Sequence, residues 1–224
     1  MSRIYLLVEG QTEEAFVREL LTPHYARIGL YLTPIIVSTR PGYKGGVVSY
    51  AKIKLQIVRL CRQHAKAHVS TLFDLYALPG DFPGKAASGY PHQGTGQHKA
   101  QYLQNSLAQD INEANFIPHL LVHEFEALLF TQPEKFAEWT DDNDVVKSLS
   151  AVAKAHVTPE DINDGPQTAP SKRVLSAMRG YQKTFHGPLI ACEIGLDAMR
   201  RACPHFHAWL QRLEALNPDN PQTP

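Results

Sequence analysis

The stretch MSRIYLLVEGQTEEAFV, residues 1–17, predicts a buried strand that ends on a carboxylate. Residues 3–8 form a short run rich in apolar β-formers, and Gly10 bounds this run. Thr12 is a candidate helix N-cap, and acidic side chains follow it in a first turn that favours negative charge. We therefore expect the strand to deliver Glu9 to the point where a helix begins.

Strand-like and helix-like segments alternate through the first part of the chain, which is typical of an α/β layer with a mainly parallel sheet. Pro23 falls inside the first helical pattern and predicts a break there. The last third of the chain is predicted to form helices that pack onto the sheet. We expect one domain over residues 1–216, with its helical C-terminal part over residues 130–216 and a disordered tail at residues 217–224. The further predicted strands are 32–37, 69–76 and 117–122, and the further predicted helices are 50–64, 97–113, 172–183 and 196–216.

The charge and cysteine content of the chain limit the classes of protein to which it can belong. The 224 residues contain 22 basic and 22 acidic side chains, so the chain has no global basic field and any nucleic-acid site must be a local patch. Three cysteines without a CxxC pair indicate a reducing compartment, and we expect a cytoplasmic protein. The opening apolar run is too short for a signal peptide, and no stretch approaches the ~18 apolar residues of a membrane span.

Acidic side chains follow three separate predicted strands. Glu9 ends the first strand, Asp74 lies near the end of the third with Asp81 in the loop beyond, and the motif HEFE follows the fourth. The carboxyl ends of parallel strands form the ligand crevice of an open α/β sheet. Hard divalent cations such as Mg²⁺ or Mn²⁺ prefer oxygen ligands. The pattern therefore predicts a metal site at this edge, with His123, Glu124 and Glu126 beside it.

Structural alternatives exist for each of these groups. Glu9 could be a solvated charge at a strand end, and Asp81 could form an Asx turn. His123 and Glu126 are spaced to share one helix face, where a structural pair is as consistent as a ligand pair. Asp74 has the strongest case for function, because apolar residues flank it and a buried carboxylate is costly without a partner.

Two loops offer basic groups for a phosphate. Ser171, Lys172 and Arg173 lie at a predicted helix start, where backbone N–H groups can hold an anion. Arg40 and Lys44 lie in the glycine-rich segment RPGYKGG, which could follow a nucleic-acid backbone. The alternatives are an ordinary helix N-cap with a solvated basic face, and a flexible loop.

The opening VEGQTEEAFV resembles TOPRIM domains, the metal-dependent fold of topoisomerases, primases and overcoming-lysogenization-defect nucleases. The second TOPRIM motif, Asp-x-Asp, reads Asp74-Leu75-Tyr76 here, so its second aspartate is absent and Asp81 is a candidate substitute. The chain is similar over residues 5–210 to the TOPRIM-like domain-of-unknown-function family 4276. The motifs that carry this resemblance are VEGQTE, FDLYALPGDFPG, HLLVHEFEALLF, INDGPQTAPSKR and IGLDAMRRACPHFHAWL.

The resemblance implies a TOPRIM-like core and a bacterial setting, in some cases beside an ATPase in an anti-phage module. In TOPRIM nucleases carboxylates hold Mg²⁺ for phosphodiester cleavage, and Glu9, Asp74 and Asp81 match those positions. Glu124 or Glu126 would assist, and His123 would contact phosphate or act as general acid-base. DNA, RNA, transfer RNA and small phosphoesters all fit such a site. The alternative is a non-catalytic binding or regulatory subunit of an ATPase complex, which the absent second aspartate favours.

Overall fold

A five-stranded parallel sheet forms the centre of the molecule in a computed structural model that describes residues 2–37, 49–162, 165 and 167–217. The order is β2-β1-β3-β4, and β5 also pairs with β3. Ser2 aligns with Leu30 and Val8 with Leu72, so β1 and β3 end side by side. The predicted α/β class is confirmed. The strands are β1 (Ser2–Val8), β2 (Leu30–Ile36), β3 (His68–Asp74), β4 (Phe116–Ile117) and β5 (Leu120–Leu121).

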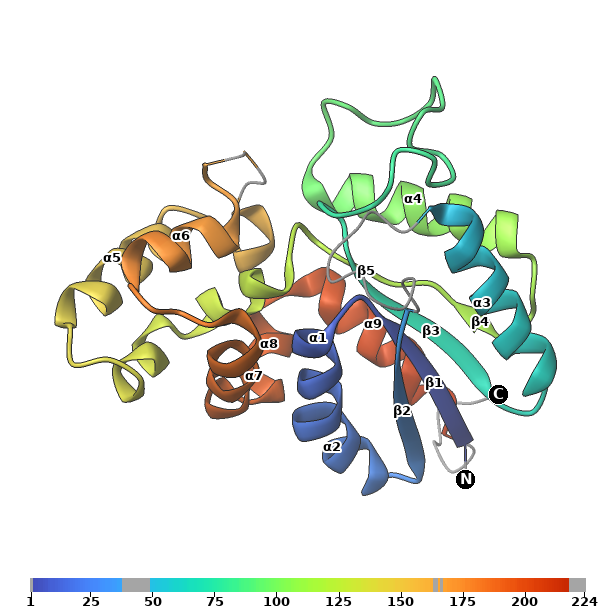
Figure 1. Cartoon of the computed structure of the whole chain (residues 1–224), viewed down its shortest axis with the longest axis horizontal. Helices are drawn as coiled ribbons and strands as arrows, with labels where there is room; N and C mark the ends of the chain where they lie inside the picture. Colours follow the sequence, from blue (N-terminus) through green and yellow to red (C-terminus); the bar gives the residue numbers. More distant parts are fainter. Residues whose placement is uncertain (1, 38–48, 163–164, 166, 218–224) are drawn as a thin grey trace.

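Helices cover both faces of the sheet (Figure 1). α3 (Tyr50–Gln63) and α4 (Gly96–Ile111) pack on one face, where Leu7 and Phe73 point. Leu6, Val8 and Leu72 point to the opposite face, where the first helices and the C-terminal helices pack. This alternation follows from the period of two in a strand, and it places a separate apolar core on each side.

The first helical segment is interrupted, as Pro23 predicts. α1 (Gln11–Phe16) passes into a π-helix, η1 (Val17–Leu21), and then into α2 (Thr22–Ala26), with Pro23 in the first turn. The widened π turn accommodates a residue that has no N–H to donate. The predicted N-cap at Thr12 is wrong. Gly10 is the N-cap and the buried Thr12 lies inside the helix.

The fourth strand is split, in contrast to the single run that its apolar residues predict. Pro118 separates β4 from β5 and cannot donate a ladder hydrogen bond. The side chain of Thr71 in β3 fills the gap, because its hydroxyl accepts from the N–H of His119 and donates to the carbonyl of the same residue.

Short helices make up the C-terminal part, and each long helix predicted there is divided. Gly180, with φ +87°, follows the end of α6. Gly195 is the N-cap of α8, and Pro204 is the first residue of α9. Within the described residues, no helix is long and apolar enough to cross a membrane. The helices are η2 (Phe125–Thr131), η3 (Pro133–Glu138), α5 (Asn143–Lys154), η4 (Pro159–Asp161), α6 (Pro170–Ala177), α7 (Lys183–Ile194), α8 (Leu196–Ala202) and α9 (Pro204–Glu214).

Candidate metal centre

Glu9 and Asp74 meet at the carboxyl ends of two neighbouring strands. Oε1 of Glu9 accepts a hydrogen bond of 2.9 Å from the main-chain N–H of Asp74. The two carboxylates therefore lie well within about 10 Å of each other, given the short reach of an aspartate side chain. This juxtaposition of Glu9 and Asp74 is the one that the strand-end pattern predicts.

Asp74 also holds the segment that follows the fourth strand. Its Oδ1 accepts a 3.0 Å hydrogen bond from the N–H of Phe125, and its side chain is almost fully buried. His123 precedes this contact in a left-handed conformation, with φ +67°, and Glu126 lies in the 3-10 helix η2. The expectation that His123 and Glu126 share a helix face is wrong, because the helix begins after His123.

Lys183 brings a positive charge from the C-terminal helices into this group of carboxylates. Its Nζ lies 3.2 Å from Glu126 Oε2, 3.7 Å from Asp74 Oδ2 and 4.0 Å from Glu13 Oε1. Lys183 is the first residue of α7, which packs closely against α1. The sequence analysis missed this residue, which lies at the boundary of a predicted helix and far from any motif used there.

Gly187 allows α7 to approach so closely. A Cβ atom at this position would lie 3.0 Å from the Tyr181 hydroxyl, 3.1 Å from a ring carbon of Phe125 and 3.5 Å from a methyl carbon of Thr12. The first two distances are tighter than ordinary van der Waals contact. A glycine here therefore places Lys183 beside the carboxylates.

Glu13 is the second residue that the sequence analysis missed as part of the site. The sequence predicts Glu13 as a favourable charge in the first turn of a helix. In agreement, its Oε2 accepts a 3.1 Å hydrogen bond from the N–H of Gly10. Its other oxygen faces Lys183, and the side chain is buried. Its position one helical turn beyond Glu9 was the available signal. We call Glu9, Glu13, Asp74 and Glu126 the acidic cluster.

Burial and mutual repulsion disfavour ionisation of Glu9, Asp74 and Glu126. Burial, aided by the charge of Glu13, raises the pKa of Glu9 to about 7. Burial raises the pKa of Asp74 well above its usual range and also raises that of Glu126. Burial alone would lower the pKa of Lys183, but attraction by Asp74 and Glu126 raises it overall. Lys183 therefore does not fully offset the cost of ionising Glu9, Asp74 and Glu126, and a second cation would lower that cost.

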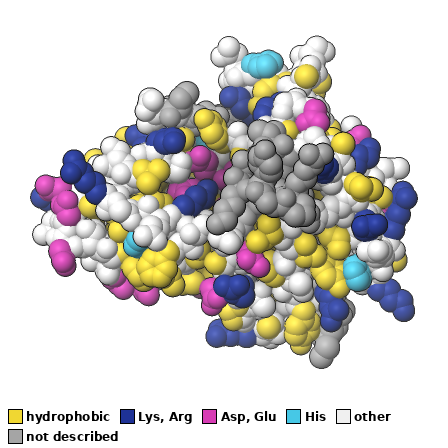
Figure 2. Space-filling view, viewed as in Figure 1, with side chains coloured by type: hydrophobic (Ala, Val, Ile, Leu, Met, Phe, Trp, Pro, Cys, Tyr) yellow, Lys and Arg dark blue, Asp and Glu magenta, His cyan; other side chains and the backbone are white. Residues whose placement is uncertain are grey.

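The donor chemistry of the acidic cluster fits a hard divalent cation. Carboxylate oxygens converge there, and the fully buried Glu126 has the Lys183 ammonium, 3.2 Å from its Oε2, as its charged neighbour. No three His, Cys, Asp or Glu side chains in that part of the chain form a ready-made metal-holding group. A divalent ion would therefore share these carboxylates with Lys183. Figure 2 shows acidic and basic side chains together near the middle of this face.

Glu124 lies beside the acidic cluster and caps a helix. Its Oε2 accepts a 2.9 Å hydrogen bond from the N–H of Ser171 at the start of α6. The anion observed at this predicted phosphate-binding turn is therefore a side chain of the same protein. Arg173 donates from Nε to the carbonyl of Thr168 at 2.7 Å, and Lys172 is exposed. Phosphate binding by Ser171, Lys172 and Arg173 stays a prediction.

Asp81 and His123 have observed contacts outside the acidic cluster. Both carboxylate oxygens of the exposed Asp81 accept from the N–H of Tyr50, at 3.2 Å each, at the start of α3. His123 is buried against Gly96, where a Cβ atom would lie 2.8 Å from Nε2. Metal binding by Asp81 and acid-base chemistry by His123 stay predictions. Arg40 and Lys44 lie outside the described residues.

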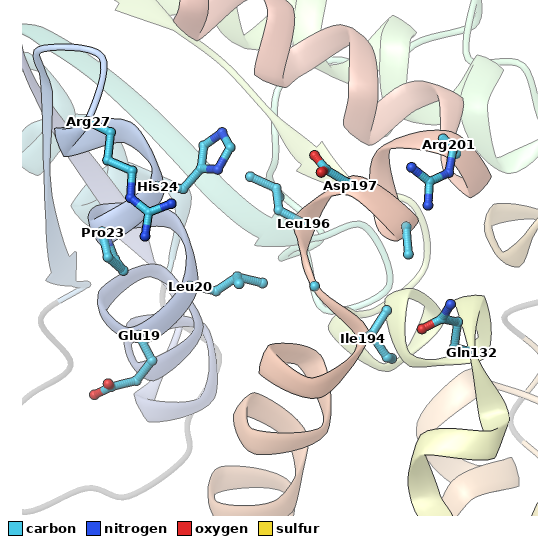
Figure 3. Close-up of a pocket in the computed structure, with 12 residues that line it drawn as sticks. Glu19, Leu20, Pro23, His24, Arg27, Gln132, Ile194, Leu196, Asp197 and Arg201 are labelled. Atoms are coloured by element: carbon cyan, nitrogen blue, oxygen red, sulfur yellow. The ribbon is translucent and has the colours of Figure 1, made fainter.

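A cavity of about 440 Å³ lies elsewhere, between α2 and the start of α8 (Figure 3). It shares no residue with the acidic cluster and is therefore a separate feature of the molecule. Its lining residues are Glu19, Leu20, Pro23, His24, Arg27, Gln132, Ile194, Gly195, Leu196, Asp197, Ala198 and Arg201.

Comparison with known proteins identifies one matching family. A family model described as "Domain of unknown function (DUF4276)" matches residues 8–214, a span that includes the whole acidic cluster and Lys183. Among solved structures, the C-terminal region of the Xanthomonas campestris pv. campestris OLD protein is similar at 15% identity and a TM-score of 0.39, over 95% of this chain and 98% of that chain. No curated protein matches the chain.

Proposed function

The chain belongs to the family described as Domain of unknown function (DUF4276), and we propose that it is a metal-dependent phosphodiesterase acting on nucleic acid. The observation that carries this proposal is the convergence of Glu13, Asp74 and Glu126 on the Lys183 ammonium, with Glu9 hydrogen-bonded to the N–H of Asp74 beside them. Buried carboxylates in negative excess are costly unless a cation compensates them. A bound divalent ion would remove that cost.

Glu9, Asp74 and Glu126 are the residues that would hold Mg²⁺ or Mn²⁺. When bound, the ion would activate water and stabilise the charge that develops on a phosphodiester. The Lys183 side chain is 40% exposed, and its ammonium would donate to a phosphate oxygen from the position that it already occupies. Glu13 holds the N–H of Gly10 and so fixes the turn that presents Glu9.

Cleavage of labelled DNA and RNA in Mg²⁺ or Mn²⁺ tests this proposal. Asp74→Asn removes a charged oxygen ligand at nearly constant size, and we expect cleavage to fall by about 100-fold or more. Asp144→Asn is the matched control, since Asp144 is exposed on α5 and pairs with Lys147. Full cleavage by Asp74→Asn, or full cleavage in excess EDTA, would contradict the proposal.

A second candidate is a non-catalytic subunit that binds nucleic acid within an ATPase complex. The observation that favours it is the position of Lys183, whose ammonium already neutralises part of the acidic cluster without a metal. Such a protein would show no change in melting temperature with Mg²⁺, and Asp74→Asn would leave its nucleic-acid affinity unchanged. Both candidate functions are compatible with a role in anti-phage defence. Phage plating on cells that carry Asp74→Asn would test this role.

A further inference from the structure

Four ring side chains form a continuous group at the start of α7, which we call the aromatic platform: Trp139, Tyr181, Phe185 and His186. His186 stacks on Tyr181 with ring centroids 5.8 Å apart and meets Phe185 edge-on at 5.0 Å. Trp139 packs edge-on against both Phe185 and His186 at 5.9 Å. The platform therefore links two segments that are distant in the sequence, the end of η3 and the first turn of α7.

One end of the aromatic platform borders the acidic cluster. The Tyr181 hydroxyl lies beside the Glu126 carboxylate, and the ring itself is buried. Lys183, which contacts Glu126, follows Tyr181 closely in the chain. Two ring contacts, of 5.8 and 5.0 Å, lead from Tyr181 through His186 to Phe185. These contacts connect Phe185, through His186, to the ring that borders the acidic cluster.

The other end of the aromatic platform is open to solvent. Phe185 is 53% exposed, whereas Tyr181 is only 6% exposed. A lone exposed hydrophobic residue is common on protein surfaces. Phe185 differs because its edge-on contact with His186 connects it to the ring that borders the acidic cluster. Its exposed surface is therefore available to a flat ligand near the site.

The aromatic platform is held in a fixed arrangement. Nδ1 of His186 accepts a 2.9 Å hydrogen bond from the N–H of Gln182, which fixes the ring and leaves the proton of the neutral imidazole on Nε2. Trp139 supports Phe185 and His186 from a different segment of the chain. Rings that are already ordered lose little conformational freedom when a ligand stacks on them.

We propose that the aromatic platform stacks unpaired nucleobases, so that the substrate is nucleic acid with a single-stranded segment. This inference rests on the proposed phosphodiesterase function and adds the substrate class. Base stacking on aromatic side chains tolerates any sequence and contributes strongly per base. Duplex bases are already stacked on each other and cannot use an exposed Phe185. Stacking also supplies affinity that a chain of zero net charge gains only weakly from the phosphate backbone.

The test is a binding comparison in Ca²⁺ with fluorescently labelled oligonucleotides of equal length, one of thymidines and one of abasic sites. We expect the wild-type protein to bind the thymidine strand roughly 5- to 100-fold more tightly than the abasic strand. Phe185→Ala should reduce this ratio to near one, and Phe185→Trp should keep it. Leu55→Ala is the matched control, because Leu55 is 67% exposed on α3, outside the platform.

The outcomes separate this inference from the proposed function. Equal binding of the two strands by the wild-type protein, or an unchanged ratio in Phe185→Ala, overturns the aromatic platform as a base-binding site. If metal-dependent cleavage persists on both strands in that case, the phosphodiesterase function stands alone. A duplex that binds as tightly as the thymidine strand and loses affinity equally in Phe185→Ala also overturns the inference.

Discussion

Nζ of Lys183 lies 3.7 Å from Oδ2 of Asp74, which joins the last residue of the central strand β3 to the first residue of α7. The sheet alone therefore does not complete the candidate site. The C-terminal helices must pack on the α1 face before the lysine can reach the carboxylates. Changes in that packing should consequently alter the site as well as the stability of the fold.

Replacing Lys183 with methionine should separate catalysis from metal binding. The variant loses the ammonium that would contact the phosphate in the proposed reaction, so we expect cleavage to fall by about 100-fold or more. Its affinity for Mn²⁺ should be unchanged or higher, because a competing cation leaves the acidic cluster. Cleavage rates and Mn²⁺ titrations on the same preparation measure both effects. Lys147→Met, at an exposed position on α5, is the control, and equal losses of activity in both variants would contradict this role.

Gly187→Ala should weaken both fold and site. The added methyl group would lie closer to the Tyr181 hydroxyl and the Phe125 ring than ordinary van der Waals contact allows, so α7 must shift away from α1. We expect a loss of roughly 1–3 kcal/mol in the free energy of unfolding, together with reduced cleavage. Gly80→Ala is the control, because no atom of the described residues lies within 4 Å of its added methyl group. Denaturant titration checks the stability change, and wild-type stability in Gly187→Ala would show that the helices are not closely packed there.

Glu160 should be essential to the attachment of the last helix. Its buried carboxylate accepts from the N–H groups of His205 and Phe206 in the first turn of α9, at 2.9 Å each, and from Nε2 of Gln97 at 3.0 Å. Glu160→Ala leaves these donors buried without an acceptor, and we expect a cost of about 2–4 kcal/mol in the free energy of unfolding. Chemical denaturation measures it, with the exposed Glu134→Ala as control. A cost equal to the control would rule out this capping role.

Acid should destabilise the protein partly through His205. Burial, with a smaller contribution from the charge of Arg212, lowers the pKa of His205 from an ordinary value of 6.5 to about 4, against a backbone hydrogen bond that raises it. A depressed folded-state pKa means that stability is fully present above pH 6.5 and is lost as pH falls towards 4. Over that pH interval, the free energy of unfolding of His205→Gln should fall by roughly 1–3 kcal/mol less than that of the wild-type protein. Urea titrations at several pH values measure the difference, and parallel losses would contradict the prediction.

The strand-end carboxylates were predictable because they depend on local pattern and on sheet geometry. Glu9 and Asp74 follow apolar runs with β character, and neighbouring parallel strands bring their ends together. The break near Pro23 and the division of helices over two faces follow from similarly local rules. These features require no knowledge of how distant helices pack.

The other half of the site was not predictable from local rules. A glutamate in the first turn of a helix is accounted for by local structure alone, so the sequence gives no sign that Glu13 also contacts Lys183. Lys183 reaches the carboxylates only because Gly187 allows a close helix approach, which is a tertiary property. The spacing of the HEFE motif predicts that His123 and Glu126 share one helix. The left-handed backbone of His123 instead places the start of the helix after it, so only Glu126 lies in the helix.

Mn²⁺ titration of the wild-type protein and of Asp74→Asn, followed by calorimetry or electron paramagnetic resonance, tests the central claim most directly. The acidic cluster predicts saturable Mn²⁺ binding to the wild-type protein and affinity weakened by about 10-fold or more in Asp74→Asn. Wild-type protein that binds no Mn²⁺ at millimolar concentration, or equal affinity in the two proteins, would contradict a metal centre at this edge of the sheet.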